Sequence, residues 1–127
     1  MTQDEDAIRA LVEDWAKAVR EKNMDGVLAN HTDDILMFDV PLPLQSQGMA
    51  EYKKTWELFF KHSPGGPGAF DLTELHVFAG DTVAYCHAII DIFGTKARLT
   101  IGLRKESQRW LIAHEHHSYP IEIETEK

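Results

Sequence analysis

The stretch RWLIAHEHHSYP, from Arg109 to Pro120, limits the possible folds more than any other segment of the chain. It is able to form a strand, and it carries three of the seven histidines. Apolar residues lie on both faces of its first half, which is typical of a strand that is covered on both sides. Its second half is polar and titratable on both faces. We therefore expect the strand to leave the core along the wall of a cavity.

The two faces of this strand carry different histidines. Strict alternation assigns His114 and His116 to one face, and Glu115 and His117 to the other. A single β-bulge would exchange the faces, so alternation alone does not say which histidines face a cavity. The pair His114 and His116 has a spacing that metal sites use, but it needs a third ligand. The candidates for that ligand are His87, Asp39 and Glu115. Face parity argues against Glu115, and we expect no metal.

Length and charge narrow the class of protein. The 127 residues fit one domain, which we expect to span residues 1–127. The net charge of −8, from 13 basic and 21 acidic residues, argues against a nucleic-acid partner. No apolar run approaches the roughly 20 residues of a membrane span, and the first residues lack a secretory signal pattern. A single cysteine, Cys86, forms no intrachain disulfide, so we expect a reducing, cytoplasmic location.

Periodicity and turn residues give the order of the elements. The sequence predicts a helix from about Gln3 to Lys22, started by a Thr2–Glu5 capping box, and a short helix after Asn23. A short apolar strand and a further helix follow, and then four long strands in a meander. Their expected ranges are 35–38 for the short strand, 49–61 for the helix, and 69–79, 82–93, 96–105 and 109–120 for the long strands. The fold class is therefore α+β, with helices packed on one face of a mostly antiparallel sheet.

Four segments carry a resemblance to a known family: NMDGVLANHTDDILMFD, QGMAEYKKTW, DTVAYCHAII and WLIAHEHHS. In their order and spacing they resemble the nuclear transport factor 2-like superfamily, in its SnoaL-like and ketosteroid-isomerase-like branch. The resemblance implies a cone-shaped α+β barrel, with a strongly curved sheet wrapped over about three N-terminal helices. It also implies a homodimer and no cofactor. This fold hosts isomerases, cyclases, dehydratases and non-catalytic binding domains, so it does not fix the function.

The resemblance also places candidate site residues. Asp39 falls where steroid isomerases hold their general base, and Trp15 falls at their oxyanion-donating tyrosine. Their second oxyanion donor, an aspartic acid, corresponds to about Thr100 or Gly102, so the donor pair is not reproduced. Trp56 falls at an aromatic pocket position. In a second comparison, His87 and His117 fall where the association domain of calcium/calmodulin-dependent kinases places inward-facing arginines.

The residues themselves support an acid/base site. Asp39 ends an apolar run and would be partly desolvated, which makes a carboxylate a stronger base. His87 or His117 would act beside it as an acid, since imidazole exchanges protons near neutral pH. The alternative is that Asp39 only ends a strand and that the histidines are wall residues. Cys86 and Ser118 are interpreted as a core residue and a strand-end hydrogen-bonding residue.

The pocket is expected to hold a small, mainly apolar carbonyl or hydroxyl compound. We expect Trp15, Trp56 and Tyr52 to form its walls. Arg98 or Thr100 would anchor an oxygen of the ligand, although Arg98 is equally interpreted as a solvated surface charge. Two functions remain open: a cofactor-independent isomerase, cyclase or dehydratase, or a non-catalytic module that binds a ligand or dimerises. The alternating apolar residues Leu99, Ile101 and Leu103 are compatible with an outer sheet face that is covered in a dimer.

Overall fold

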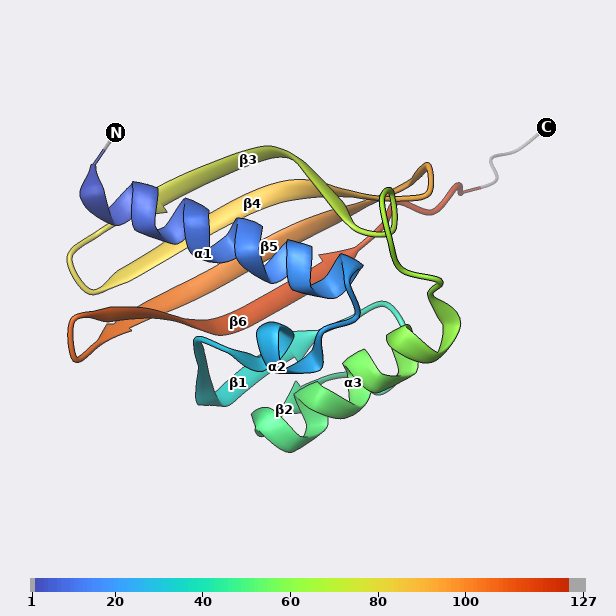
Figure 1. Cartoon of the computed structure of the whole chain (residues 1–127), viewed down its shortest axis with the longest axis horizontal. Helices are drawn as coiled ribbons and strands as arrows, with labels where there is room; N and C mark the ends of the chain where they lie inside the picture. Colours follow the sequence, from blue (N-terminus) through green and yellow to red (C-terminus); the bar gives the residue numbers. More distant parts are fainter. Residues whose placement is uncertain (1, 124–127) are drawn as a thin grey trace.

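The computed structural model describes residues 2–123, so residue 1 and residues 124–127 of the predicted domain lie outside the described part. This part of the chain forms three helices and six strands, and the last four strands follow one another directly (Figure 1). In chain order they are α1 (Gln3–Arg20), α2 (Met24–Leu28), β1 (His31–Phe38), β2 (Ser46–Gln47), α3 (Gly48–His62), β3 (Asp71–Ala79), β4 (Val83–Ile92), β5 (Thr95–Glu106) and β6 (Arg109–Ser118). This content confirms the predicted α+β class.

The helix α1 begins where the sequence predicted. The Thr2 hydroxyl accepts the backbone N–H of Glu5, and the Glu5 carboxylate accepts the backbone N–H of Thr2, which completes the capping box. Its buried face carries Ile8, Val12 and other residues at helical spacing. The helix ends at Arg20, slightly before the predicted end, and the Asn23 side chain caps α2 by accepting the Gly26 N–H at 3.2 Å.

All six strands form one sheet in the order β2-β1-β6-β5-β4-β3. The strands β3 to β6 form the predicted antiparallel meander. β1 pairs with β6 in parallel, and this pairing already includes His31 opposite Ile112. The strand therefore begins four positions before the predicted Ile35. Its first residues form a strand because they pair with β6, which is distant in sequence, and their own apolar pattern does not reveal this. α1 crosses β3 and its neighbours, while α3 lies against β1 (Figure 1).

The helices cover the face of the sheet that carries Cys86, Ala88 and Ile90 on β4 and the apolar alternation of β5. Leu99, Ile101 and Leu103 are buried in this core. The suggestion that these three residues form an outer, dimerising face is therefore wrong. The opposite face of the same strands is the solvent-facing side.

A bulge in β6 decides which histidines point inward. Gly102 of β5 pairs with His114, while the next residue, Leu103, pairs with Ile112. Ala113 is therefore an extra residue without a partner on β5, and it reverses the side-chain alternation. Trp110 and Ile112 are buried before the bulge, and Glu115 and His117 are buried after it.

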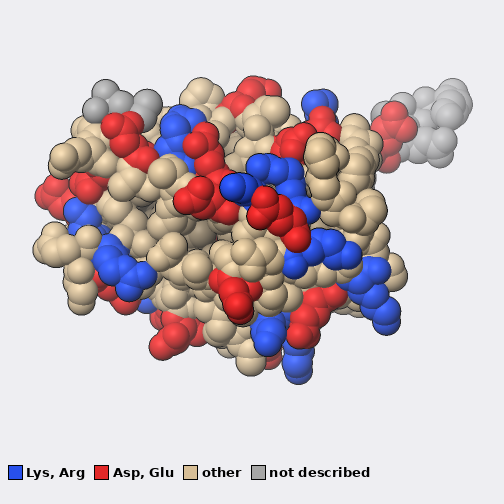
Figure 2. Space-filling model, viewed as in Figure 1, with Lys and Arg blue, Asp and Glu red and all other residues tan. Residues whose placement is uncertain are grey.

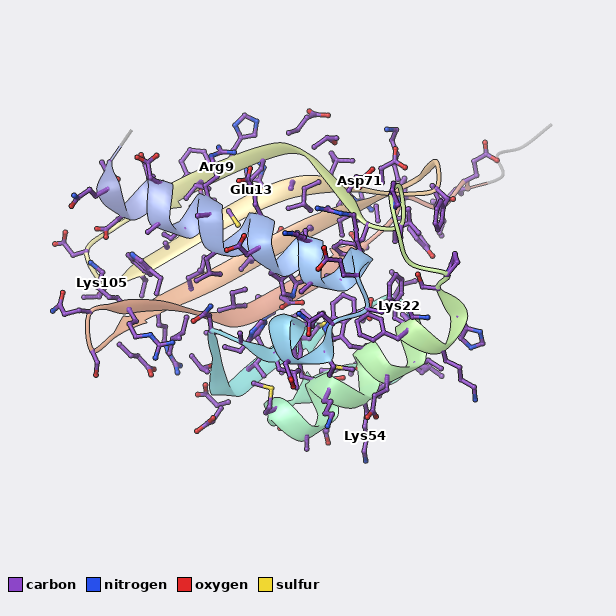
Figure 3. The ribbon with its side chains drawn as sticks, viewed as in Figure 1. Arg9, Glu13, Lys22, Lys54, Asp71 and Lys105 are labelled. Carbon is purple, nitrogen blue, oxygen red and sulfur yellow. The ribbon has the colours of Figure 1, made fainter. Side chains whose placement is uncertain are left out.

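The face of the molecule that Figure 2 shows has no large patch of one charge sign among the described residues. Acidic and basic side chains are interspersed over the face shown in Figure 2. On α3, Lys54 points away from the sheet (Figure 3), in agreement with its exposed position. None of the helices within residues 2–123 is long and apolar enough to cross a membrane.

Candidate functional site

A cavity of about 280 Å³ lies between α3, the loop after β1 and the inner face of β4 and β5. Its wall is mainly apolar and aromatic, and the residues that line it are Asp39, Val40, Pro41, Thr55, Trp56, Leu58, Phe59, His62, Phe70, Ile90, Ile92, Ala97, His117 and Tyr119. Among these are two candidate acid/base residues, Asp39 and His117. Small-molecule sites commonly combine such an apolar wall with a few polar groups.

Asp39 is placed at the cavity by the end of β1. It directly follows Phe38, the last residue of the strand, and 21% of its side chain is accessible to solvent. Its Oδ1 accepts the backbone N–H of Val40 at 2.7 Å, which holds the carboxylate in the turn. Oδ1 also lies 3.5 Å from Nδ1 of His117. Both of these contacts use Oδ1, and Oδ2 has no hydrogen-bond partner within residues 2–123.

His117 lies between two carboxylates. Its Nδ1 faces Asp39, and its Nε2 lies 3.3 Å from Oε1 of Glu115. A carboxylate only accepts hydrogen bonds, so both carboxylates are satisfied together when each ring nitrogen carries a hydrogen, which is the imidazolium form. Burial disfavours that charge, but the hydrogen bonds to Asp39 and Glu115 outweigh it and raise the pKa of His117 to about 9.

Glu115 is completely buried behind His117. Burial opposes its ionisation, but the hydrogen bonds and positive charges of His117 and His31 outweigh this effect and lower its pKa to about 2. Its Oε2 accepts the Tyr52 hydroxyl at 2.5 Å and lies 3.0 Å from Nε2 of His31. The Nδ1 of His31 donates to the carbonyl of Ala29 at 2.7 Å. Sequence reasoning missed His31 and weighed Glu115 only as a metal ligand.

Tyr52 and Trp15 belong to this buried network and not to the cavity wall. The Trp15 indole N–H donates to the Tyr52 hydroxyl at 3.2 Å. Burial and the neighbouring Glu115 charge hold the pKa of Tyr52 well above its usual value. Neither residue lines the cavity, so the expectation that both would form its walls is wrong. Trp56 does line it, and its ring centroid lies 5.9 Å from that of His117.

Three other predicted site residues point away from the cavity. His87 is exposed on the outer face of β4, with its ring 5.4 Å from that of His76 on β3. Arg98 and Thr100 are exposed on the outer face of β5, and Arg98 donates to the Ser118 hydroxyl at 3.2 Å. The predictions that His87 shares the cavity and that Arg98 or Thr100 anchors a ligand are therefore wrong. The inner positions of both strands hold apolar side chains instead.

The possible metal pair is also separated from other donors. His114 directs its Nδ1 to the carbonyl of Leu36 at 2.8 Å, and His116 is exposed. Across the described part of the chain, no three histidine, cysteine or acidic side chains come together as ligands would.

A known protein family and solved structures resemble this chain over nearly its whole length. The family model of the SnoaL-like domain matches residues 8–122. The chain belongs to the SnoaL-like domain family. No curated protein matches the chain. A solved NTF2-like protein of unknown function from Pseudomonas putida KT2440 is 34% identical, over 100% of this chain and 94% of that chain, with a TM-score of 0.87.

Two more distant structures share the fold of this SnoaL-like domain. A candidate dehydratase of the NTF2-like family from Streptomyces avermitilis is 14% identical, over 94% of this chain and 97% of that chain, with a TM-score of 0.79. A ketosteroid isomerase-like protein from Erwinia carotovora atroseptica is 19% identical, over 93% of this chain and 97% of that chain, with a TM-score of 0.74. At these identities the likeness establishes the NTF2-like fold.

Proposed function

We propose that this SnoaL-like domain is a cofactor-independent enzyme that moves a proton on a small, mainly apolar carbonyl or hydroxyl compound. The observation that supports the proposal is the Asp39–His117 pair at the wall of an apolar cavity. The free Oδ2 of Asp39 is the base, and the adjacent imidazolium of His117 is the positive charge of the site.

The reaction begins with Asp39 taking a proton from a carbon next to the carbonyl group. The C–H bond breaks, its electron pair enters the enolate, and the negative charge develops on the ligand oxygen. The positive charge of His117, 3.5 Å from Oδ1 of Asp39, favours this build-up of negative charge. Asp39 then returns the proton to a different carbon in an isomerisation. In a dehydration, the enolate electron pair forms a C=C bond as the C–O bond of a β-hydroxyl group breaks, and the proton held by Asp39 passes to that oxygen, which leaves as water.

The size of the cavity limits the ligand. About 280 Å³ is near the lower end of the range of roughly 300–1,000 Å³ for small-molecule sites, which favours a compact compound. Aromatic rings of Trp56, Phe59 and Phe70 form part of the wall, so a planar apolar body would pack well against them. The names of the Streptomyces and Erwinia proteins, a candidate dehydratase and a ketosteroid isomerase-like protein, belong to the same reaction classes.

Proton abstraction is tested directly by deuterium exchange. A panel of small cyclic and aromatic ketones is incubated with the protein in D₂O, and loss of the proton next to the carbonyl is followed by NMR. The Asp39→Asn variant keeps the shape of the side chain but removes its basicity. We expect exchange to fall by about 10²-fold or more, in line with the usual contribution of a general base. His87→Ala, on the outer face, is the control and is expected to exchange at the wild-type rate. Equal exchange by Asp39→Asn and wild type would remove Asp39 as the base.

A non-catalytic ligand-binding module is the second candidate. The observation that favours it is that the hydrogens of His117 and of the Trp15 indole are directed to protein acceptors and not to the cavity. A ketone that binds in the cavity, with no exchange above the buffer rate in the wild type, would support the module over the enzyme.

We also propose that the domain forms a homodimer through the outer face of the sheet, as the resemblance implies. Large apolar side chains are exposed on that face, among them Phe78 and Tyr85. The rings of these two residues are stacked, with their centroids 5.0 Å apart. Equilibrium sedimentation at micromolar concentration tests the proposal, and a monomer would reject it.

A further inference from the structure

Glu115 is a fully buried carboxylate without a lysine or arginine partner among the ion pairs of the described residues. Its compensation comes from His117 on Oε1, and from Tyr52 and His31 on Oε2. A buried charge is costly unless it is paired and hydrogen-bonded. An apolar side chain would fill this position without that cost. The acid therefore calls for an explanation beyond packing.

We propose that Glu115 is a positioning residue for the Asp39–His117 pair: it fixes the plane of the His117 ring and holds the ring as an imidazolium directed at Asp39. The catalytic meaning of this role rests on the proposed function. The structural part of the proposal, the control of the charge and orientation of His117, does not depend on any substrate.

The contacts of its two nitrogens fix the orientation of the His117 ring. The two ring nitrogens of His117 lie on opposite sides of the imidazole, and each faces a carboxylate oxygen, at 3.5 Å for Asp39 and 3.3 Å for Glu115. The ring cannot flip or turn without losing both contacts. With Glu115 alone removed, Asp39 would still accept one N–H, but the second nitrogen would have no carboxylate acceptor. The imidazolium would then lose its proton more easily, and the positive charge beside the base would be weakened.

A second layer of donors explains why Glu115 itself stays charged and in place. The Tyr52 hydroxyl comes from α3 and the His31 ring from β1, so Oε2 is held from two different elements. Trp15 on α1 donates to Tyr52 in turn. A chain of contacts thus runs from α1 through Glu115 and His117 to the base Asp39. Such support from behind is what holds functional groups in a productive geometry.

The other titratable groups around the pair do not compete for this role. Cys86 on β4 is buried, and burial together with the Glu115 charge outweighs the effect of Arg9 and raises its pKa to about 12, so it stays a neutral thiol. His62 at the end of α3 and Tyr119 after β6 also line the cavity, and within residues 2–123 neither makes a hydrogen bond or ion pair with Glu115 or His117. The charge of His117 is therefore set by Glu115 and Asp39.

The test is an NMR titration of the imidazole nitrogens in the ¹⁵N-labelled protein without ligand. In the wild type, both nitrogens of His117 are expected to show the protonated signature up to about pH 8. In Glu115→Gln the shape is kept and the charge is removed. We expect the pKa of His117 to fall from about 9 toward the ordinary histidine value of 6.5. Glu106→Gln, an exposed carboxylate on β5 held by Arg104, changes the net charge equally and is expected to leave His117 unchanged.

The outcomes are separable. A His117 ring that is neutral at pH 7.5 in the wild type overturns the proposal, and this measurement needs no variant to fold. A folded Glu115→Gln variant whose His117 titrates as in the wild type also overturns it. If Asp39→Asn keeps full exchange activity while Glu115→Gln shifts the titration of His117, the proposed function fails and the positioning role stands. If both hold, Glu115→Gln should additionally displace the alkaline limb of the exchange rate to lower pH.

Discussion

Glu115 and His117 are two positions apart on β6, and both side chains point into the protein, with Oε1 of the acid 3.3 Å from Nε2 of the histidine. On a regular strand, residues i and i+2 share a face, so the strand itself brings this acid and base together. Burial of both groups makes the contact sensitive to pH. The fold and the candidate site therefore depend on the same ion pair.

The pair predicts a stability maximum in mildly acidic solution. The folded-state pKa of His117, about 9, lies above its usual 6.5, so its contribution is complete below pH 6.5 and is lost as the pH rises toward 9. The pKa of Glu115, about 2, lies below its usual 4.5, so its contribution is complete above pH 4.5 and is lost as the pH falls toward 2. The pKa shift of His117 corresponds to roughly 3 kcal/mol of folding free energy. The pKa shift of Glu115 arises in part from the same contact, so the two contributions are not added.

Urea unfolding at pH 6 and pH 9 measures this effect. We expect the free energy of unfolding to be about 2–3 kcal/mol lower at pH 9 than at pH 6. His117→Gln removes the titrating ring, so its free energy of unfolding should change much less between the two conditions. An equal decrease in the variant would assign the pH dependence to other groups.

The hydroxyl of Tyr52 is predicted to contribute much more to the free energy of unfolding than the hydroxyl of an exposed tyrosine. Tyr52→Phe leaves Oε2 of Glu115 without its shortest donor and the Trp15 N–H without its acceptor. We expect a loss of about 2–3 kcal/mol in the free energy of unfolding, since buried polar groups are left unsatisfied. Tyr85→Phe makes the same chemical change on the outer face and should stay within about 0.5 kcal/mol. Similar losses in the two variants would contradict a role for this network.

The bulge at Ala113 is predicted to be essential for the register of β6. Deleting Ala113 restores regular alternation, which would turn Glu115 and His117 to the solvent side or displace Trp110 and Ile112 from the core. We expect the deletion variant not to fold, which corresponds to a loss of more than about 5 kcal/mol. Circular dichroism and thermal unfolding measure this. Ala113→Gly keeps the length of the strand, and it should retain the fold. A folded deletion variant would show that the register tolerates the change.

The same bulge marks the limit of prediction from the sequence. The long strands and helices were predicted within a few residues, because periodicity and turns such as Gly94 are local signals. Which face of β6 points inward was not predictable, because the extra residue is only defined by the pairing of Gly102 with His114 on another strand. The pairing of β2, Ser46–Gln47, was missed because two residues carry no period.

The errors in the site have a related cause. Alternation on β5 separates Arg98 and Thr100 from Leu99 and Ile101, but it does not say which set faces the helices. An apolar strand face fits a core as well as an interface, so the pattern of Leu99 and Ile101 alone does not separate the two. Asp39 was placed at the cavity by the family resemblance, since an aspartate at the end of a strand has no distinguishing pattern of its own. His31 was missed because its partner, Glu115, lies 84 positions away in sequence.

Filling the cavity is predicted to block ligand binding without unfolding the protein. Ala97 on β5 lines the cavity and is buried, so Ala97→Leu would direct three more carbons into the space of about 280 Å³. We expect the affinity for a small aromatic ketone to fall at least about tenfold, which is about 1.4 kcal/mol. Overpacking a filled core usually costs about 1–3 kcal/mol. The free energy of unfolding should change by less than this, because the added group enters empty space. Titration calorimetry and urea unfolding measure the two quantities.

Ala97→Ser nearly keeps the size of the side chain and should bind the ketone as the wild type does. The affinity of Ala97→Val should lie between those of the wild type and Ala97→Leu. Wild-type affinity in Ala97→Leu would mean that the ligand binds outside this cavity, and the Asp39–His117 pair would then lose its substrate.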